Sequence, residues 1–89
     1  MDKASSFDPK SLTGAQLRAA RALADMTVKQ LSGLTKLGVN TLLRAEKEHG
    51  TVKMTPANAE RVVSALETAG VEFLAENGGG AGVRFRQGS

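Results

Sequence analysis

The sequence predicts a mainly α fold in which four short helices are followed by a C-terminal β-hairpin. Capping signals mark the starts of three helices, and apolar residues recur at helical spacing within the predicted helices. Near the C-terminus, two short alternating segments flank a glycine-rich stretch, which is typical of a hairpin. The 89 residues are enough for one domain with a single modest core.

The first two helices share one start signal, a threonine followed three residues later by a glutamine. These capping boxes are Thr13 with Gln16 and Thr27 with Gln30. Apolar residues flank each cap at the spacing of a hydrophobic staple, Leu12 with Leu17 and Met26 with Leu31. We expect the first helix to end at about Ala24, and the second to run from Val28 to about Thr35.

Two further helices follow a break at Lys36-Leu37-Gly38. The third helix is predicted from Val39 to Lys47 and stops in a polar run. Thr55 and Pro56 form a cap followed by a proline at the first helical position, which begins the fourth helix. That helix is predicted to end at Gly70, a natural residue just beyond a helix C-terminus.

The tail differs in pattern from the helices. Val71–Leu74 and Val83–Arg86 alternate around glycine-rich residues 77–82, which predicts a hairpin, with a flexible glycine linker as the alternative. An isolated hairpin is marginal in water, so it must pack on the fourth helix or on a second subunit. The chain therefore divides into a flexible N-terminal arm (1–11), a helical domain (12–70), and a hairpin that is the candidate dimerisation element (71–89).

The composition excludes several classes of protein. The chain has no cysteine, so it forms neither a disulfide framework nor a thiolate metal site. The only histidine, His49, is expected to be an exposed loop residue, with a phosphate contact as the alternative. The chain lacks a long apolar run, a signal-peptide core, a phosphate-binding glycine motif before a helix, and clustered carboxylates. We therefore expect a cytoplasmic protein that is not an enzyme and has no cofactor, metal or membrane partner.

Charge is distributed unevenly along the chain, whose net charge is +3. Residues 1–55 contain nine Lys and Arg against five Asp and Glu, a net charge of +4, whereas residues 56–89 carry a net charge of −1. The basic part is a candidate surface for a polyanion, and solvated lysines without a partner are the alternative.

Residues 26–46 predict a helix-turn-helix, because two short helices joined by three residues must cross at a steep angle. The first and fourth helices then form a floor, expected to bury four leucines: Leu31, Leu34, Leu37 and Leu42. The outer face of the third helix is left projecting, and a helix of this width fits the major groove of B-DNA.

Residues 13–66 resemble the Cro and phage-repressor type of helix-turn-helix proteins, the Xre-like regulators. The resemblance is carried by LRAARALADMTVKQLS and VNTLLRAE, which follow the family pattern or replace it conservatively at seven positions: Met26, Thr27, Leu31, Ser32, Thr41, Leu42 and Glu46. The tail, residues 70–86, is similar to the hairpin that ends many short bacterial members. The resemblance implies a four-helix lambda-repressor-like domain. It further implies an ion pair between Arg21 and Glu46 that ties the recognition helix to the scaffold.

Two positions depart from the family pattern. Lys36 stands where the turn usually has glycine, so it is expected to adopt a positive φ. Val28 occupies a place that is often a phosphate-binding glutamine.

Four residues of the third helix are the candidate base contacts: Val39, Asn40, Leu43 and Arg44. They share one face with Lys47 at helical spacing. Arginine suits guanine, asparagine suits adenine, and an apolar side chain suits the thymine methyl. The alternatives are a solvated or phosphate-binding Arg44, an Asn40 that caps the helix start, and packing roles for Val39 and Leu43.

Phosphate contacts are expected to surround this helix. The N–H groups at the start of the second helix form an anion site. The side-chain candidates are Thr27, Lys29, Lys36, Thr41, Lys47 and Lys53. For each of them a solvated side chain is the alternative.

Together these features predict a sequence-specific transcriptional regulator that binds double-stranded DNA at a palindromic operator as a homodimer. The resemblance further implies a nucleoid-associated protein of the bacterial type. Pairing of Val83–Arg86 across a two-fold axis is the expected dimer contact, with the two recognition helices about 34 Å apart. The alternative is a protein-interaction module, of the anti-activator or antitoxin type, that uses the same fold to bind another regulator. The apolar Val39 and Leu43 on the outer face favour that alternative.

Overall fold

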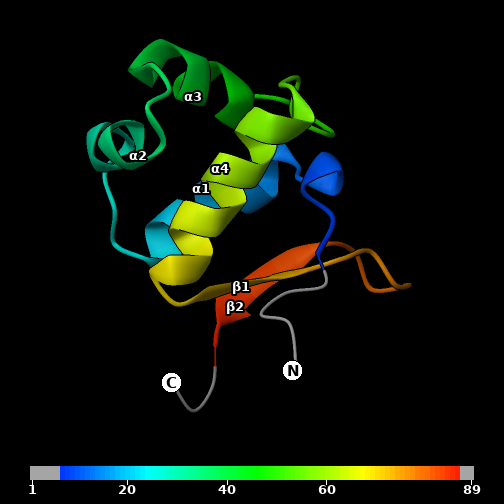
Figure 1. Ribbon diagram of the computed structural model, residues 1–89. Helices are drawn as coiled ribbons and strands as arrows, with labels where there is room; N and C mark the ends of the chain where they lie inside the picture. Colours follow the sequence, from blue (N-terminus) through cyan, green and yellow to red (C-terminus); the bar gives the residue numbers. More distant parts are fainter. Residues whose placement is uncertain (1–6, 87–89) are drawn as a thin grey trace.

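Four α-helices and a two-stranded antiparallel hairpin follow one another in residues 7–86, the part of the chain that the computed structural model describes (Figure 1). A short 3-10 helix, η1, precedes them. The bounds are η1 Pro9–Ser11, α1 Gly14–Leu23, α2 Val28–Thr35, α3 Val39–Glu46, α4 Pro56–Thr68, β1 Val71–Leu74 and β2 Gly82–Phe85. The predicted mainly α fold with a C-terminal hairpin is confirmed. None of the helices in residues 7–86 is long and apolar enough to cross a membrane.

The predicted capping boxes set where α1 and α2 begin. The hydroxyl of Thr13 accepts the Gln16 N–H at 3.1 Å, and the Gln16 side chain accepts the Thr13 N–H at 3.0 Å. The same reciprocal pair joins Thr27 and Gln30 at the start of α2. Each box satisfies two N–H groups that a helix start otherwise leaves without partners.

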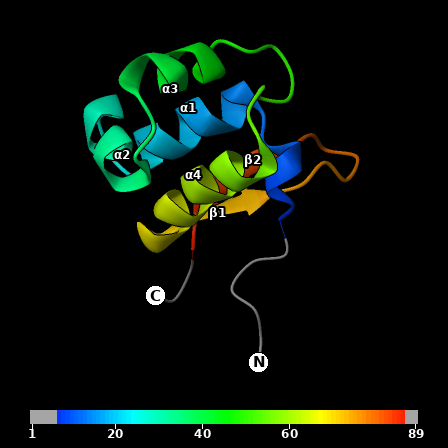
Figure 2. The same cartoon turned by 45° about the horizontal axis from the view of Figure 1, so that its top comes forward.

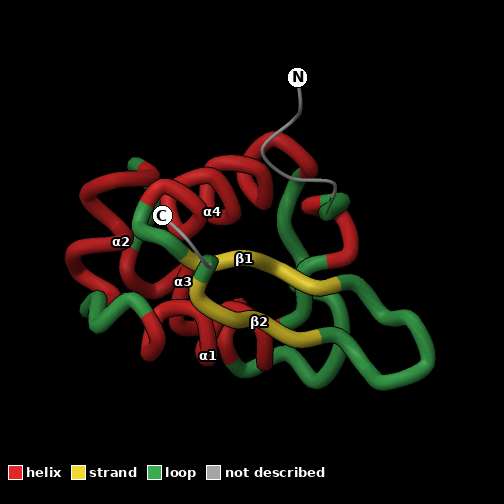
Figure 3. The backbone as a smooth tube through the Cα atoms, turned by 90° about the horizontal axis from the view of Figure 1, so that it is seen from below, coloured by secondary structure: helices red, strands yellow, loops and turns green. Residues whose placement is uncertain are grey.

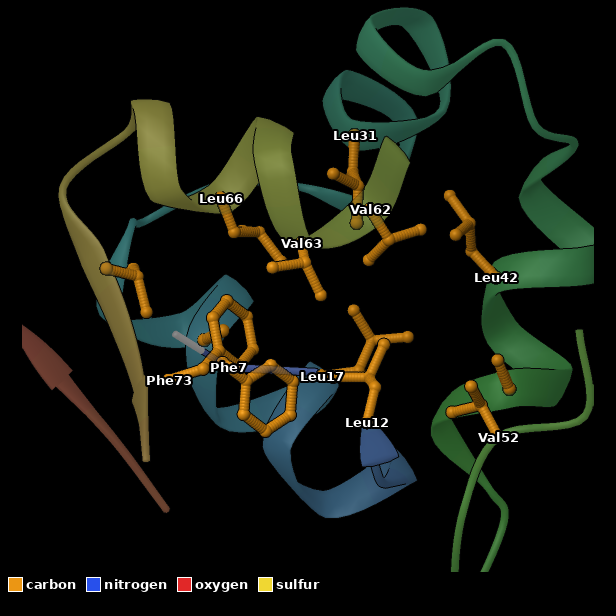
Figure 4. Packing of buried hydrophobic residues seen from close by; sticks show 13 residues of the cluster. Phe7, Leu12, Leu17, Leu31, Leu42, Val52, Val62, Val63, Leu66 and Phe73 are labelled. Atoms are coloured by element: carbon orange, nitrogen blue, oxygen red, sulfur yellow. The ribbon is translucent and has the colours of Figure 1, made fainter. Parts of the chain in front are cut away.

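The helices form two layers, with the hairpin beneath them. α2 and α3 lie on one side of α1 and α4, and the hairpin lies on the other side (Figures 1 and 2). The core fills the space between α1 and α4, where Leu17 faces Val62 and Val63, while Leu31 and Leu42 enter from α2 and α3 (Figure 4). All five side chains are buried, so burial of this apolar face holds the short α2 and α3 in place.

The hairpin is anchored to α1 by a buried glutamine. β1 and β2 pair in register from Val71 opposite Phe85 to Leu74 opposite Gly82 (Figure 3). The side-chain amide of Gln16 donates to the carbonyls of Leu74 and Gly82, each at 3.1 Å. The hairpin therefore packs on the helices of its own chain, which meets the condition for a stable two-stranded sheet.

The predicted flexible arm is wrong for residues 7–11, and residues 1–6 of that prediction lie outside the described part. Phe7 is buried, and its ring stacks on that of Phe73 with centroids 5.3 Å apart. The Asp8 carboxylate accepts the Lys10 N–H and caps η1. Burial of the Phe7 ring contributes more free energy than the loss of conformational entropy on ordering residues 7–11 costs. This one apolar side chain therefore overrides the polar composition of its neighbours.

The prediction that Leu34 is buried is also wrong, because this residue is 61% exposed. Leu31 and Thr35, one turn apart, occupy the buried face of α2. Leu34 lies on the flank of that face. Helical spacing alone did not distinguish the centre of the buried stripe from its edge.

Candidate nucleic-acid interface

The turn between α2 and α3 is held by a small set of hydrogen bonds. Lys36 ends α2 in the left-handed conformation, with φ 65° and ψ 22°, and its N–H donates to the Ser32 carbonyl at 2.8 Å. The Ser32 hydroxyl donates to the Leu37 carbonyl, and the Leu37 N–H donates to the Thr35 hydroxyl. The expected positive φ at Lys36 is confirmed, and the turn fixes the angle between the two helices.

The α3 helix has one buried and one exposed face. Leu42, Ala45 and Glu46 are buried, whereas the exposed residues are Asn40, Thr41, Leu43, Arg44 and Lys47. The hairpin packs on α1 and α4, on the far side of the molecule from α3 (Figures 1 and 3). The outer face of α3 is therefore not covered by the hairpin.

The four candidate base contacts lie on or beside this exposed face. Asn40, Leu43 and Arg44 are exposed, and Val39 at the helix start is half-buried. Within residues 7–86, the Asn40 side chain makes no capping hydrogen bond and Arg44 makes no ion pair. The polar groups of Asn40 and Arg44 are thus available to a partner. Val39 packs partly against the protein and is partly exposed.

The six candidate phosphate contacts are all exposed, but two have local partners. The Thr27 hydroxyl accepts the Gln30 N–H and keeps its own hydrogen to donate. The Lys53 ammonium lies 3.7 Å from the Glu48 carboxylate, a surface ion pair of little energetic consequence. The α2 capping box leaves the N–H groups of Val28 and Lys29 without a partner in the described part of the chain.

The surface around the motif is cationic because its one carboxylate is buried. Residues 26–47 contain four cations and a single acid, Glu46. The cations are Lys29, Lys36, Arg44 and Lys47, all exposed. Glu46 is buried, so within residues 26–47 no exposed carboxylate offsets the four exposed cations.

Glu46 is held by a bidentate ion pair with Arg21 of α1. Arg21 Nε lies 2.6 Å from Glu46 Oε2, and Nη2 lies 3.1 Å from Oε1. Nη1 donates to the Met26 carbonyl at 3.0 Å. The hydrogen bond to Glu46 raises the pKa of Arg21, against the opposing effect of burial. The structure thus contains the ion pair that the resemblance implied, joining α1 to the end of α3.

Sequence reasoning missed two further α1 residues that touch the end of α3. The Arg18 guanidinium donates to the Glu46 backbone carbonyl. Gly14 packs directly against the backbone of Ala45 and Glu48. Neither role leaves a signal in the sequence, because both contacts join the start of α1 to residues about thirty positions later.

No protein-family model and no curated protein matches this chain. Among the described residues, no three His, Asp or Glu side chains gather to hold a metal ion.

Proposed function

We propose that this protein is a sequence-specific transcriptional regulator of the Cro and phage-repressor type that inserts α3 into the major groove of DNA. The observation that carries the proposal is the outer face of α3, which is exposed, cationic and lacks an exposed carboxylate. A short helix held at both ends and projecting from a domain fits the groove, and phosphate attraction supplies most of the affinity.

The residues of α3 divide into two kinds of contact. Arg44 and Asn40 carry donors suited to guanine and adenine edges, and Leu43 offers an apolar contact to a thymine methyl. Lys29, Lys36 and Lys47 flank that face as point charges for phosphate oxygens. Replacing Arg44 is expected to change which sequence is preferred, whereas replacing Lys29 weakens binding to every sequence alike.

The hairpin is proposed to join two subunits through the edge of β2 that faces away from β1. The Arg86 N–H donates to the Gly70 carbonyl at 2.7 Å, so the backbone groups of Val83 and Phe85 point away from β1. Phe85 itself is 55% exposed. Pairing along this edge sets two subunits side by side with both α3 helices facing one duplex. Stacking the outer faces of two hairpins would point the helices in opposite directions, because the hairpin lies opposite α3.

Selection of bound sites from a random duplex pool tests DNA binding and symmetry together. We expect an enriched palindromic motif, and titration of the selected duplex at two salt concentrations should give a slope of about −0.9 per neutralised phosphate. An unenriched pool with no measurable affinity at low salt would reject the proposal. A motif without dyad symmetry would reject the dimer alone.

The exposed Leu34 favours a second candidate function, a protein-interaction module. Two surface hollows of about 370 and 470 Å³ adjoin it. The first is lined by Arg61, Ser64, Ala65 and Thr68, the second by residues 24–26, Gln30 and Gly33. Such a site takes an apolar side chain of another protein, and it lies off the exposed face of α3. Leu34→Ser in the full-length protein separates the functions, because it leaves DNA affinity unchanged if α3 is the functional surface.

A further inference from the structure

The α3 helix is too short to fix its own orientation. It has eight residues, about two turns. A small rotation or shift of such a helix displaces Asn40 and Arg44 relative to whatever they contact. Its position therefore depends on what holds its two ends. The turn at Lys36–Gly38 holds the N-terminal end, and the start of α1 holds the C-terminal end.

Gly14 brings the backbone of α1 into direct contact with the end of α3. A Cβ atom at this position would lie 2.5 Å from the Glu48 carbonyl oxygen and 2.7 Å from that of Ala45, far inside the ordinary contact range that begins at 3.4 Å. Both atoms belong to the backbone, so no side-chain rotation relieves the clash. Gly14 has no positive φ to explain its identity, since it lies in α1. The close approach to α3 is the reason for glycine here.

The chain that follows α3 is fastened to the same place. The Gly14 N–H donates to the Gly50 carbonyl at 3.1 Å, and the Val52 N–H donates to the Leu12 carbonyl at 2.9 Å. Thr13 and Thr51 form the isolated bridge between these two hydrogen bonds. Figure 2 shows the loop after α3 passing beside the start of α1. Residues 48–52 therefore do not move away from an added side chain without breaking this pairing.

Arg18 completes the contact from the next turn of α1. Its guanidinium donates to the Glu46 carbonyl, one of the four carbonyls that a helix C-terminus leaves without an intrahelical partner. A cation at this end also interacts favourably with the helix dipole. Arg18 therefore binds the backbone of Glu46, and Arg21 binds its side chain.

We propose that Gly14 and Arg18 are positioning residues that set the orientation of α3 and so determine which bases its outer face meets. The effect on base recognition rests on the function proposed above, but the orientation of α3 is a property of the free protein. Neither residue belongs to the exposed face of α3, so both act on sequence preference through the backbone of Ala45, Glu46 and Glu48.

The decisive variant is Gly14→Ala in the full-length protein, with Gly33→Ala as the matched control. Gly33 also lies in a helix, and a Cβ there meets nothing within 4 Å. Residual dipolar couplings of the α3 amides, measured in a frame defined by α1 and α4, report the orientation of α3 without DNA. We expect them to change in Gly14→Ala and to match wild type in Gly33→Ala. Unchanged couplings in a folded Gly14→Ala protein would overturn the proposal.

The DNA measurement compares the selected duplex with a random duplex of the same length. Gly14→Ala is expected to lower the preference for the selected site about tenfold, the order expected for a misaligned base contact, while the affinity for random duplex and the salt slope stay unchanged. Equal loss on both duplexes would show a general structural defect and contradict the proposal. Absence of binding by the wild-type protein would reject the proposed function, and the dipolar couplings would still decide the positioning role.

Arg18 provides the second pair of variants if Gly14→Ala does not fold. Arg18→Ala removes the donor to the Glu46 carbonyl from an exposed side chain, and Arg18→Lys keeps a cation with donors. We expect Arg18→Ala to shift the α3 couplings and to lower site preference with no change in salt slope, and Arg18→Lys to restore part of both. A salt slope reduced by about one in Arg18→Ala, with α3 unmoved, would identify a plain phosphate contact instead.

Discussion

Replacing Glu46 by alanine tests whether the ion pair with Arg21 holds α3 to the scaffold. The substitution removes two charge-assisted hydrogen bonds, of 2.6 and 3.1 Å. Breaking a fully buried pair costs about 3–5 kcal/mol. The cost here is smaller, because Arg21 keeps its bond to the Met26 carbonyl and its side chain is 26% exposed, against 7% for Glu46. We expect a loss of about 2–3 kcal/mol.

Thermal unfolding followed by circular dichroism measures this loss directly. For a domain of this size each kcal/mol corresponds to about 4–8 °C, so the Tm should fall by about 10–20 °C. The Tm of Glu46→Gln should fall less, because glutamine keeps the shape of the side chain and one acceptor. The double variant Arg21→Met with Glu46→Leu should recover most of the loss, because no charge is left unpaired. A melting curve of Glu46→Ala equal to that of wild type would refute this reasoning.

The pH dependence of the same variant has a definite sign. The pKa of Arg21 is raised by the hydrogen bond to Glu46. A raised pKa in the folded state stabilises the fold at all pH values below the ordinary guanidinium pKa, and this stability is lost only as the pH rises through the raised value. The Tm difference between wild type and Glu46→Ala should therefore be the same at pH 6 and pH 9.

Three further predictions concern the turns, the N-terminal segment and the hairpin. Lys36 and Asp25 adopt the left-handed conformation, with φ 65° and 54°. Replacing either by glycine removes the backbone strain and should raise the unfolding free energy by about 0.5–1 kcal/mol. Only Lys36→Gly should also lower affinity for all duplexes. Phe7→Ala should cost about 3–5 kcal/mol in urea unfolding, whereas a flexible arm would give no change. Gln16→Leu leaves two carbonyls without their shared donor and should cost about 2–3 kcal/mol, with weakened amide exchange protection in β1 and β2 but not in α3.

The local elements could be predicted from the sequence because their signals are local. Thr13 and Thr27 mark helix starts through groups three residues away, and the hairpin follows from alternation on either side of a glycine-rich loop. The candidate contacts on α3 could be placed on one face for the same reason, since helical periodicity fixes which residues share a side. Their exposure agrees with that periodicity, except that Val39 is half-buried.

Predictions failed where one side chain decides against the pattern around it. The polar residues near the N-terminus indicated a flexible arm, but the Phe7 ring stacks on that of Phe73, more than sixty positions later in the chain. Leu34 has the spacing of a core residue, but the width of the buried stripe on α2 depends on how closely α4 approaches. Neighbouring residues in the sequence encode neither the Phe7–Phe73 contact nor the approach of α4 to α2.

The sequence by itself determined the order, type and approximate bounds of the helices and strands, and the set of cations and polar groups carried by α3. Only the tertiary structure decided that the hairpin leaves the outer face of α3 uncovered, and that Gly14 and Arg18 hold the end of that helix beside the ion pair that the resemblance had implied. The physical reason is range. Caps and periodicity act over one or two turns, whereas the position of α3 is set by close contacts between segments that meet only after the chain has folded.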